Sequence, residues 1–376
     1  MKELTCVDLF SGAGGLSIGF GLAGFNVLAA NDFDTDCAKT YQYNHPHTQF
    51  IAGPIQDISG KELLSRTGLH VGELDCIIGG PPCQSFSVNN HQRGMQDERS
   101  GLFREYLRIV DSLKPKFVVM ENVPGMSSVA KGRVIHDIVS GLKDLGYYID
   151  APVLLRAEDF GVPQERRRLL FIGSRLNSQI IKPRPVNGEA NPPPTVWDAI
   201  GDLPELANGT GMEEQPYGML PHTTYQKWSR GTCEILANHV APALSKINLE
   251  RLKHIPPGGS WRDIPFDLLP EGMKRARRSD HTKRYGRLRP EGLASTILTK
   301  CDPHWGAYFH PYQHRALSVR EAARLQSFPD TFRFLGSKVE QYRQIGNAVP
   351  PLLAKSIAEV VREMIETANC GYSVAL

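Results

Sequence analysis

Residues 4–32, LTCVDLFSGAGGLSIGFGLAGFNVLAAND, join two apolar runs through a glycine-rich turn and a helical stretch. The runs 4–9 and 26–30 predict β-strands, and 15–23 predicts a helix between them. A glycine-rich turn between a strand and a helix lets the backbone approach a ligand closely at the helix N-terminus. The stretch therefore predicts a βαβ unit with a nucleoside or dinucleotide site, although its G-x-G-G spacing departs from the G-x-G-x-x-G fingerprint and a tight packing turn is the alternative.

Outward from this unit, strands and helices continue to alternate through residue 175. Near-continuous apolar strands such as FVVM, separated by helices, favour a mostly parallel sheet with helices on both faces, a Rossmann-like α/β fold. The further strands are predicted at 75–79, 116–121, 147–155 and 169–173, and the further helices at 35–43, 102–113 and 133–145.

The composition changes at about residue 176, where KPRPVNGEANPPPTVWDAI carries five prolines in 19 residues. From there to about 286 the chain is rich in Gly, Pro and polar residues, which predicts a smaller, loop-rich domain. Order resumes after residue 287, with a strand predicted at STILT (295–299) and helices at 319–326 and 350–365. We therefore assign 1–175 and 287–376 to one domain and 176–286 to the other.

Charge and cysteine usage narrow the functional classes. The segment from Arg251 to Arg289 contains eleven Lys and Arg but only four Asp and Glu, a local charge of +7. This charge favours a polyanionic binding partner over a basic surface that is merely solvated. The seven cysteines form no CxxC pair, so neither a structural metal site nor a disulfide framework is expected. With no long apolar segment and no signal peptide, we expect a cytoplasmic protein without a membrane anchor.

Several polar residues follow the ends of the predicted strands. Asp32 ends the second strand, where a carboxylate grips ribose hydroxyls, and Cys83 follows the strand 75–79 in GGPPCQSFS. Taken alone, Cys83 is more often a buried structural thiol than a nucleophile. Glu121 ends another strand, and Arg166 and Arg168 lie two apart on one face of a segment entering a strand. A core Glu and a structural ion pair are the alternatives for these three.

Taken together and in order, the motifs resemble the C5-cytosine methyltransferases of bacterial restriction–modification systems. The matching blocks run from residue 8 to residue 358: DLFSGAGGLSIGF, NDFD, PPCQSFS, ENV, QERRR and QIGNAVPPLLAKSIA. The resemblance implies the S-adenosylmethionine-dependent methyltransferase fold, with 176–286 as the target-recognition domain. It also implies transfer of a methyl group to C5 of a cytosine flipped out of duplex DNA.

The resemblance assigns catalytic roles by position. Cys83 matches the family's nucleophile, which attacks C6 of the cytosine, and Glu121 matches the acid at N3 and the exocyclic amine. Arg166 and Arg168 match the QxRxR arginines, with Arg168 preferred as the contact to the base carbonyl. The polar run 85–101 resembles the family's mobile catalytic loop; Gln84 directly before it, and Ser87 and Arg99 within it, are candidate DNA contacts.

The resemblance also implies the binding residues, with S-adenosyl-L-homocysteine as the product released. The cofactor contacts would be Phe10, Ser11, Gly12, Gly14, Gly15, Asp32, Phe33, Asp57, Ile58, Pro82, Leu102, Asn347 and Val349. The DNA contacts beyond the catalytic loop would be Ser260, Arg262, Arg277, Arg278, Arg284 and Arg287. The family often has Glu at the ribose position, where this chain has the shorter Asp32. By residue type alone Phe33 is equally plausible as core, and Asp57 as a helix cap.

Three other functions fit part of the pattern. A tRNA cytosine methyltransferase shares the catalytic core, but the long basic domain favours DNA. A nicotinamide-dependent oxidoreductase would explain the first βαβ unit, but it leaves Cys83 and Glu121 without a common role. A catalytically silent DNA-binding regulator would need neither an intact Cys83 nor an intact Glu121. We expect a monomer on double-stranded DNA, associated with the bacterial nucleoid and paired with a restriction endonuclease.

Overall fold

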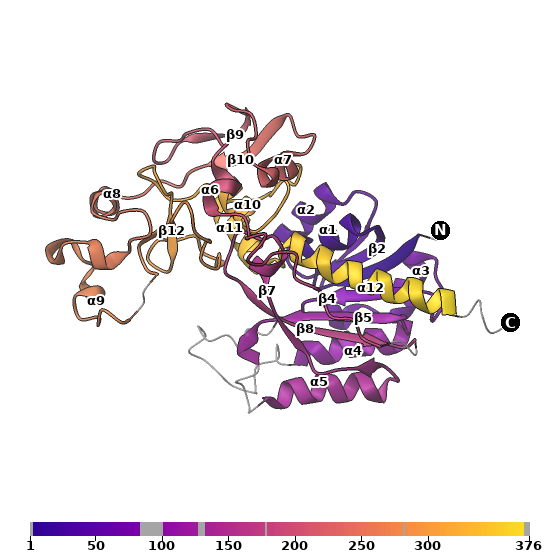
Figure 1. Ribbon diagram of the computed structural model, residues 1–376. Helices are drawn as coiled ribbons and strands as arrows, with labels where there is room; N and C mark the ends of the chain where they lie inside the picture. Colours follow the sequence, from indigo (N-terminus) through magenta and orange to yellow (C-terminus); the bar gives the residue numbers. More distant parts are fainter. Residues whose placement is uncertain (1–2, 83–100, 127–131, 177–178, 281–282, 372–376) are drawn as a thin grey trace. The chain divides into compact units, whose positions relative to one another are not determined.

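The computed structural model of the chain (Figure 1) describes residues 3–82, 101–126, 132–176, 179–280 and 283–371. Of residues 370 and 371 it describes only the backbone. The chain forms two compact units. The first comprises Met1–Arg156, Arg167–Pro185 and Val349–Leu376, and the second comprises Ala157–Arg166 and Val186–Ala348. Residues 287–348 thus pack with the second unit, whereas we predicted them in the first domain; which segment recognises the DNA target stays a prediction.

The first unit is built on an eight-stranded sheet in the order β3-β2-β1-β4-β5-β8-β6, with β7 also paired to β8. The strands from β3 to β5 are parallel, whereas β6, β7 and β8 run antiparallel to their neighbours. The strands are β1 Leu4–Leu9, β2 Phe25–Asp32, β3 Gln49–Ala52, β4 Cys76–Gly79, β5 Phe117–Asn122, β6 Tyr148–Ile149, β7 Val153–Arg156 and β8 Arg167–Ser174. The predicted mostly parallel α/β sheet is confirmed.

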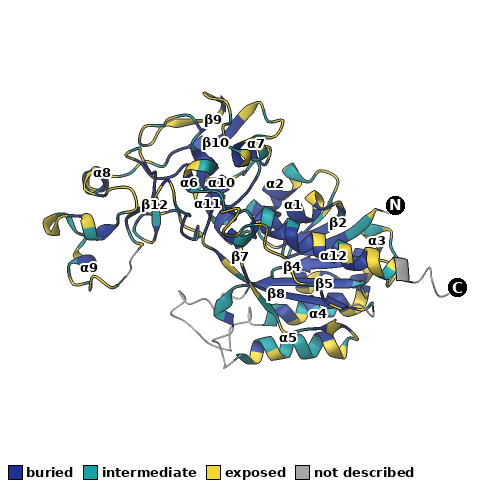
Figure 2. Cartoon of the chain, in the orientation of Figure 1, coloured by how far each residue is buried: buried dark blue, intermediate teal, exposed yellow. Residues whose placement is uncertain are grey.

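Helices cover both faces of this sheet (Figure 1). Helices α3, α4 and α5 bury their apolar sides in one core with β1, β4 and β5, and α1, α2 and α12 lie over the other face. The strands β1, β2, β4, β5 and β8 are mostly buried, while the outer sides of α5 and α12 are exposed (Figure 2). The helices are α1 Gly15–Leu22, α2 Thr35–Asn44, α3 Gly60–Thr67, α4 Leu102–Leu113, α5 Arg133–Asp144 and α12 Pro351–Gly371.

The packing of α1 on α12 depends on one glycine. A Cβ on Gly19 would lie 2.3 Å from Cβ of Ala354, whereas a Cβ on Gly21 of the same helix would meet nothing within 4 Å. We therefore expect Gly19→Ala to lower the free energy of unfolding by about 1–3 kcal/mol through overpacking. Gly21→Ala, the matched control, should leave stability unchanged or raise it by up to about 1 kcal/mol. Urea unfolding measures both, and equal effects would contradict this account.

The second unit has little regular structure. Its strands are β9 Gly211–Pro216, β10 Ile235–Val240, β11 Gly286–Arg287 and β12 Ala307–Phe309. Its helices are α6 Val196–Ile200, α7 Thr224–Arg230, α8 Lys246–Lys253, α9 Glu271–Lys274, α10 Val319–Leu325 and α11 Lys338–Asn347. Buried ion pairs contribute to its interior: Arg324 lies between Asp202 and Asp330, and Arg315 donates to Glu321. Each of these guanidinium groups is therefore paired with carboxylates, which burial requires.

Two predicted strands were wrong. The stretch 147–155 forms two strands, β6 and β7, separated by residues that include Pro152, which has no N–H for a ladder. STILT forms no strand because side chains take up its backbone groups: Ile297 N–H donates to Gln164, Ile297 C=O accepts from Arg166, and Leu298 N–H donates to Tyr308. Tertiary contacts overrode its β-propensity.

Candidate active site

The motifs on different strands meet at one edge of the sheet. Leu9 at the end of β1 pairs with Gly79 at the end of β4, and Gly79 pairs with Met120 near the end of β5. Between β1 and β4 the strand order reverses, which is where open α/β sheets bind ligands. The antiparallel β8 begins at the same edge, since Leu170 pairs with Glu121. The glycine turn, the GGPPC segment, Glu121 and the start of β8 therefore lie together.

The glycine turn after β1 has a strained backbone. Phe10, Gly12 and Gly14 have positive φ angles of 58°, 54° and 99°, which only glycine adopts at low cost. A Cβ on Gly14 would lie 2.7 Å from His45 Nε2, whereas nothing lies within 4 Å of a Cβ on Gly12. Gly14 is therefore required by packing, while the space beside Gly12 is open to a ligand.

Asp32 is tied to this turn by hydrogen bonds. Its Oδ2 accepts from the Gly12 N–H at 2.8 Å and its Oδ1 from the Asp34 N–H at 2.9 Å. Burial raises the pKa of Asp32, and the amides of Asp34 and Gly12 oppose that rise. The Phe33 side chain beside it is 65% exposed, so it belongs to the surface rather than to the core. A carboxylate and an accessible ring thus stand next to the open turn.

Beneath the turn lies a buried polar cluster that sequence analysis missed. Ser17 Oγ donates to Asp8 Oδ2 at 2.6 Å and contacts Tyr41 Oη at 2.7 Å. Burial, the largest cause, and the Asp32 carboxylate together raise the pKa of Asp8 to about 7. The Ser17 hydrogen bond opposes this rise. The only signal in the sequence is the polar Asp8 inside an apolar strand.

We expect Asp8 to make stability depend on pH. Between its unfolded pKa, near 4, and about 7 the folded chain holds a proton that the unfolded chain has released. Its stabilising effect is therefore complete below about pH 4 and is lost as pH rises through 7, on the order of 4 kcal/mol in all. Urea unfolding at pH 5 and pH 8 should show about 3 kcal/mol of this loss in the wild type and none of it in Asp8→Asn. An unchanged slope in Asp8→Asn, with the partly exposed Asp137→Asn as control, would contradict it.

The segment that leads to Cys83 is attached to β5. Asn122 Nδ2 donates to the carbonyl of Pro81 at 3.0 Å, and a Cβ on Gly80 would lie 3.1 Å from Glu121 Oε2. Gly80 therefore leaves room for the Glu121 carboxylate. Cys83 itself, with Gln84, Ser87 and Arg99 and nearly all of the predicted loop, lies outside the described residues.

Glu121 forms an ion pair with Arg168. The Arg168 Nε contacts Glu121 Oε1, and both side chains are nearly buried, at 12% and 11% exposed. Burial lowers the pKa of Arg168, and the Glu121 carboxylate opposes that effect. The pair joins β5 to β8 at the edge where the other motifs meet, so an acid and a guanidinium flank the segment that leads to Cys83.

Comparisons with known proteins agree with this geometry. The family model described as C-5 cytosine-specific DNA methylase matches residues 4–363. The chain belongs to this family. It is 34% identical to the type II methyltransferase M.AgeI of Thalassovita gelatinovora, over 96% of this chain and all of that protein. It is 38% identical to M1.HphI of Haemophilus parahaemolyticus, over 96% of this chain and 87% of that protein.

A solved structure is similar over nearly the whole chain. It is an Escherichia coli prophage protein described as a candidate DNA modification methyltransferase, 28% identical with a TM-score of 0.77, covering 96% of this chain and 99% of that one. The predicted DNA cytosine-5-methyltransferase activity and fold are thereby confirmed, and the tRNA alternative is less well supported. C5 DNA methylases depend on S-adenosylmethionine.

The family's two QxRxR arginines have different surroundings in this chain. Arg168 lies in β8 of the first unit, whereas Arg166 belongs to the second unit and is 1% exposed. The Arg166 guanidinium donates to the carbonyls of Ile297, Gly346 and Ala348. These contacts hold the segment around Asn347; a contact of Arg166 with the base stays a prediction without support from this geometry.

The remaining predicted cofactor contacts of the methylase have varied surroundings. Asp57 is exposed in a 3-10 turn, Ile58 is buried, and Leu102 is the first residue of α4. Val349 is buried just before α12, whereas Asn347 is exposed at the end of α11 in the second unit. Their contacts with a cofactor stay predictions.

Two predicted DNA contacts of the methylase are buried. The Arg287 guanidinium donates to the carbonyls of Ile255, His310 and Gln313, so it holds loops together and is not free for a phosphate. Ser260 is 8% exposed, and its N–H donates to Asp263 Oδ2. Arg277 and Arg278 are exposed, and Arg262 and Arg284 are partly exposed.

No helix in the part of the chain that the structure describes is long and apolar enough to cross a membrane. Within the same residues, no three His, Cys, Asp or Glu side chains are grouped so that they could hold a metal ion.

Proposed function

We propose that the chain methylates C5 of a flipped-out cytosine within a specific duplex DNA sequence, as the modification enzyme of a restriction–modification pair. One observation carries the proposal: the Glu121–Arg168 ion pair lies at the sheet edge where β4 leads towards Cys83 and β1 leads into the open glycine turn. A nucleophile, an acid and a nucleoside-type site are thereby supported at one place.

The residues of the turn fit S-adenosylmethionine. The space beside Gly12 is open, and Ser11 Oγ is buried without a hydrogen-bond partner among the described residues. We propose that Ser11 and the turn hold the methionine part, that Asp32 binds the ribose and that Phe33 flanks the adenine. When bound there, S-adenosylmethionine supplies an electrophilic methyl group, and S-adenosyl-L-homocysteine is the product.

The chain's own residues would activate the cytosine. The Cys83 thiolate forms a bond to C6, and the electron pair of the C5–C6 double bond moves into the ring towards N3. A proton from Glu121 neutralises N3, which makes C5 nucleophilic. Arg168 donates to the base carbonyl and orients Glu121. After methylation a base removes the C5 proton, the electrons of the C5–H bond form the C5–C6 double bond and expel the Cys83 thiolate, and N3 returns its proton to Glu121. Adding a thiolate is needed because C5 of cytosine is a poor nucleophile.

Glu121 must be protonated to act as this acid, yet in the ion pair Arg168 favours its charged form. The carbonyl of the entering base must therefore take over part of the contact with Arg168, which weakens the ion pair and lets Glu121 hold its proton. The predicted loop, with Gln84, Ser87 and Arg99, would close over the flipped base and offset the few kcal/mol of unstacking.

Recognition of the DNA target is proposed for residues 176–286, through exposed arginines such as Arg277 and Arg278. Phosphate contacts of this kind make binding weaken steeply with salt. A monomer on DNA, a partner endonuclease and a cytoplasmic location remain predictions from the sequence.

Mapping 5-methylcytosine after incubation with a random duplex library and S-adenosylmethionine tests the function. We expect methylation within one short sequence motif. Methylation of tRNA, with no modification of any duplex, would reverse the conclusion in favour of the RNA alternative.

A further inference from the structure

A pair of side chains in the second unit has no role in the chemistry above. Trp305 is 52% exposed, and the guanidinium carbon of Arg284 lies 5.0 Å from its ring centroid. This distance is within the range of a cation–π contact. Among the residues that the structure describes, no carboxylate forms an ion pair with Arg284, whereas its neighbour Lys283 is paired with Glu165. Arg284 therefore offers its N–H groups to a partner outside the described chain.

Three segments distant in sequence hold this pair in place. The Trp261 N–H donates to the Arg284 carbonyl at 3.0 Å, and the Tyr285 N–H donates to the Pro303 carbonyl at 2.7 Å. Tyr285 has a φ of 50°, a strained angle for an aromatic residue, and is buried in a core with Trp261. The peptide unit that joins Arg284 to Tyr285 is thus anchored through both its C=O and its N–H.

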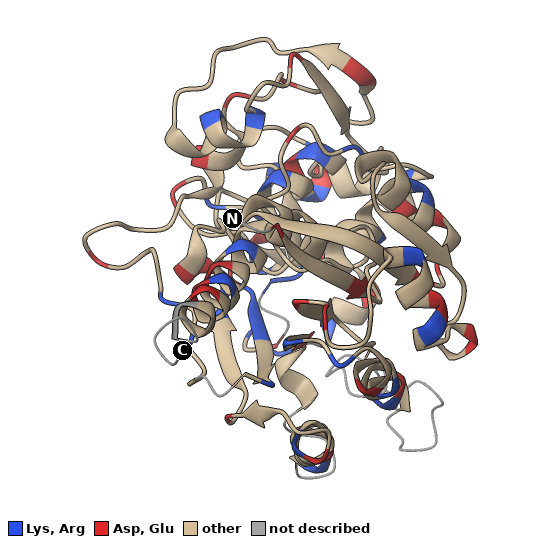
Figure 3. Cartoon of the chain, turned by 90° about the vertical axis from the view of Figure 1, so that its right-hand side faces the viewer, with Lys and Arg blue, Asp and Glu red and all other residues tan. Residues whose placement is uncertain are grey.

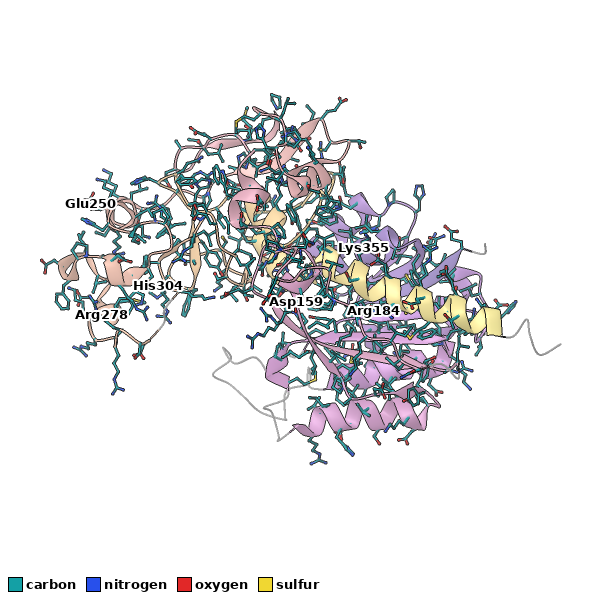
Figure 4. The ribbon with its side chains drawn as sticks, viewed as in Figure 1. Asp159, Arg184, Glu250, Arg278, His304 and Lys355 are labelled. Atoms are coloured by element: carbon teal, nitrogen blue, oxygen red, sulfur yellow. The ribbon has the colours of Figure 1, made fainter. Side chains whose placement is uncertain are left out.

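The Trp305 ring is supported as well. Its centroid lies 5.1 Å from that of His304, which in turn packs edge-on against Tyr285 at 5.7 Å. His304 Nδ1 contacts Tyr285 Oη at 3.3 Å. The backbone N–H of His304 donates to Asp302 Oδ1, and the backbone N–H of Trp305 donates to the Asp302 carbonyl. His304 is labelled in Figure 4. A chain of edge-to-face aromatic contacts therefore leads from the core to an exposed indole beside the Arg284 guanidinium.

We infer that Arg284 reads a guanine of the target sequence and that Trp305 is the positioning residue that holds it. A guanidinium stacked on a ring keeps its planar fork free, and that fork matches O6 and N7 of guanine in the major groove. Pre-ordering it on Trp305 reduces the entropy lost on binding. The inference rests on the proposed function.

Charge favours DNA over a protein as the partner. The acidic and basic residues of the helices in view are interspersed (Figure 3), but the segment 251–289 that carries Arg284 has a charge of +7. An exposed Trp–Arg pair is also typical of protein interfaces, and that alternative is an outcome of the test below.

The test uses duplexes with the mapped methylation site in which each guanine in turn is replaced by 7-deazaguanine, which lacks the N7 acceptor. We expect the wild-type chain to bind one of these duplexes several-fold more weakly than the unmodified site, and Arg284→Ala to be insensitive to that same replacement. Arg284→Ala should bind the unmodified site roughly 10- to 100-fold more weakly. Arg284→Lys should weaken the discrimination but keep the salt dependence, because the ammonium keeps the charge and can still donate to N7 but lacks the planar fork.

Trp305→Ala should lose affinity and discrimination as Arg284→Ala does, whereas Trp305→Phe should keep most of the binding. Urea unfolding checks that each variant folds. Arg278→Ala is the matched control: as a phosphate contact, it should weaken all duplexes equally and lower the salt slope by about one. Arg278 is labelled in Figure 4.

Uniform weakening by Arg284→Ala, or Arg284→Lys with unchanged discrimination, would overturn the reading role and leave the proposed function intact. A change of oligomeric state with unchanged DNA binding would overturn it in favour of a protein interface. Absence of duplex binding by the wild-type chain would overturn both.

Discussion

A duplex with 5-fluorocytosine at the methylated position should trap the wild-type chain in a covalent complex when S-adenosylmethionine is present. The C5 fluorine cannot leave as a proton, so the elimination that frees Cys83 is blocked. Cys83→Ser should form no such complex and should lose more than about 10⁴-fold in methyl transfer, since a hydroxyl is a far weaker nucleophile than a thiolate. Denaturing gel electrophoresis and transfer of labelled methyl groups measure the two effects.

Cys233→Ser is the matched control for this experiment. Cys233 is a partly exposed free thiol of the second unit, whereas Cys83, Glu121 and Arg168 belong to the first, so its variant should form the complex as the wild type does. A complex of equal yield with Cys83→Ser would show that another residue attacks the base.

Glu121→Gln should have the next largest effect. The amide keeps the size of the side chain and can still accept from Arg168, but it can neither carry the charge of the ion pair nor donate an acidic proton to N3. We expect kcat to fall about 10²- to 10⁴-fold, the usual effect of losing a general acid. Single-turnover methyl transfer, with urea unfolding alongside, separates the chemical effect from any loss of stability.

Arg168→Met tests whether the pair acts as one unit. If it does, the double variant should lose little more activity than Glu121→Gln alone. Glu359→Gln, which breaks an exposed ion pair with Lys355 on α12, is the control and should change neither activity nor stability by more than about 0.5 kcal/mol. Activity of Glu121→Gln within tenfold of the wild type would contradict its role as the acid.

Sequence patterns predicted those strands and helices whose apolar periodicity and flanking turn residues indicate the same element. The strand Leu4–Leu9 and the helix Leu102–Leu113 have the predicted bounds, because an apolar run or stripe and the adjoining glycine turn point to the same structure. The helix Gly60–Thr67 was missed although Ser59, whose side chain accepts from the Glu62 N–H, provided a capping signal. The strand Gln49–Ala52 was missed because only one of its four residues is buried.

The sequence by itself determined the family, the α/β class and the motifs that carry the chemistry, since these depend on residue type and order along the chain. Only the tertiary structure decided what neighbouring residues of one motif contact. Arg166 and Arg168 are equivalent in an extended segment, yet one donates to three backbone carbonyls of the second unit and the other pairs with Glu121. The partner of a buried guanidinium comes from segments up to 182 residues away, and no local pattern specifies which of them will be there.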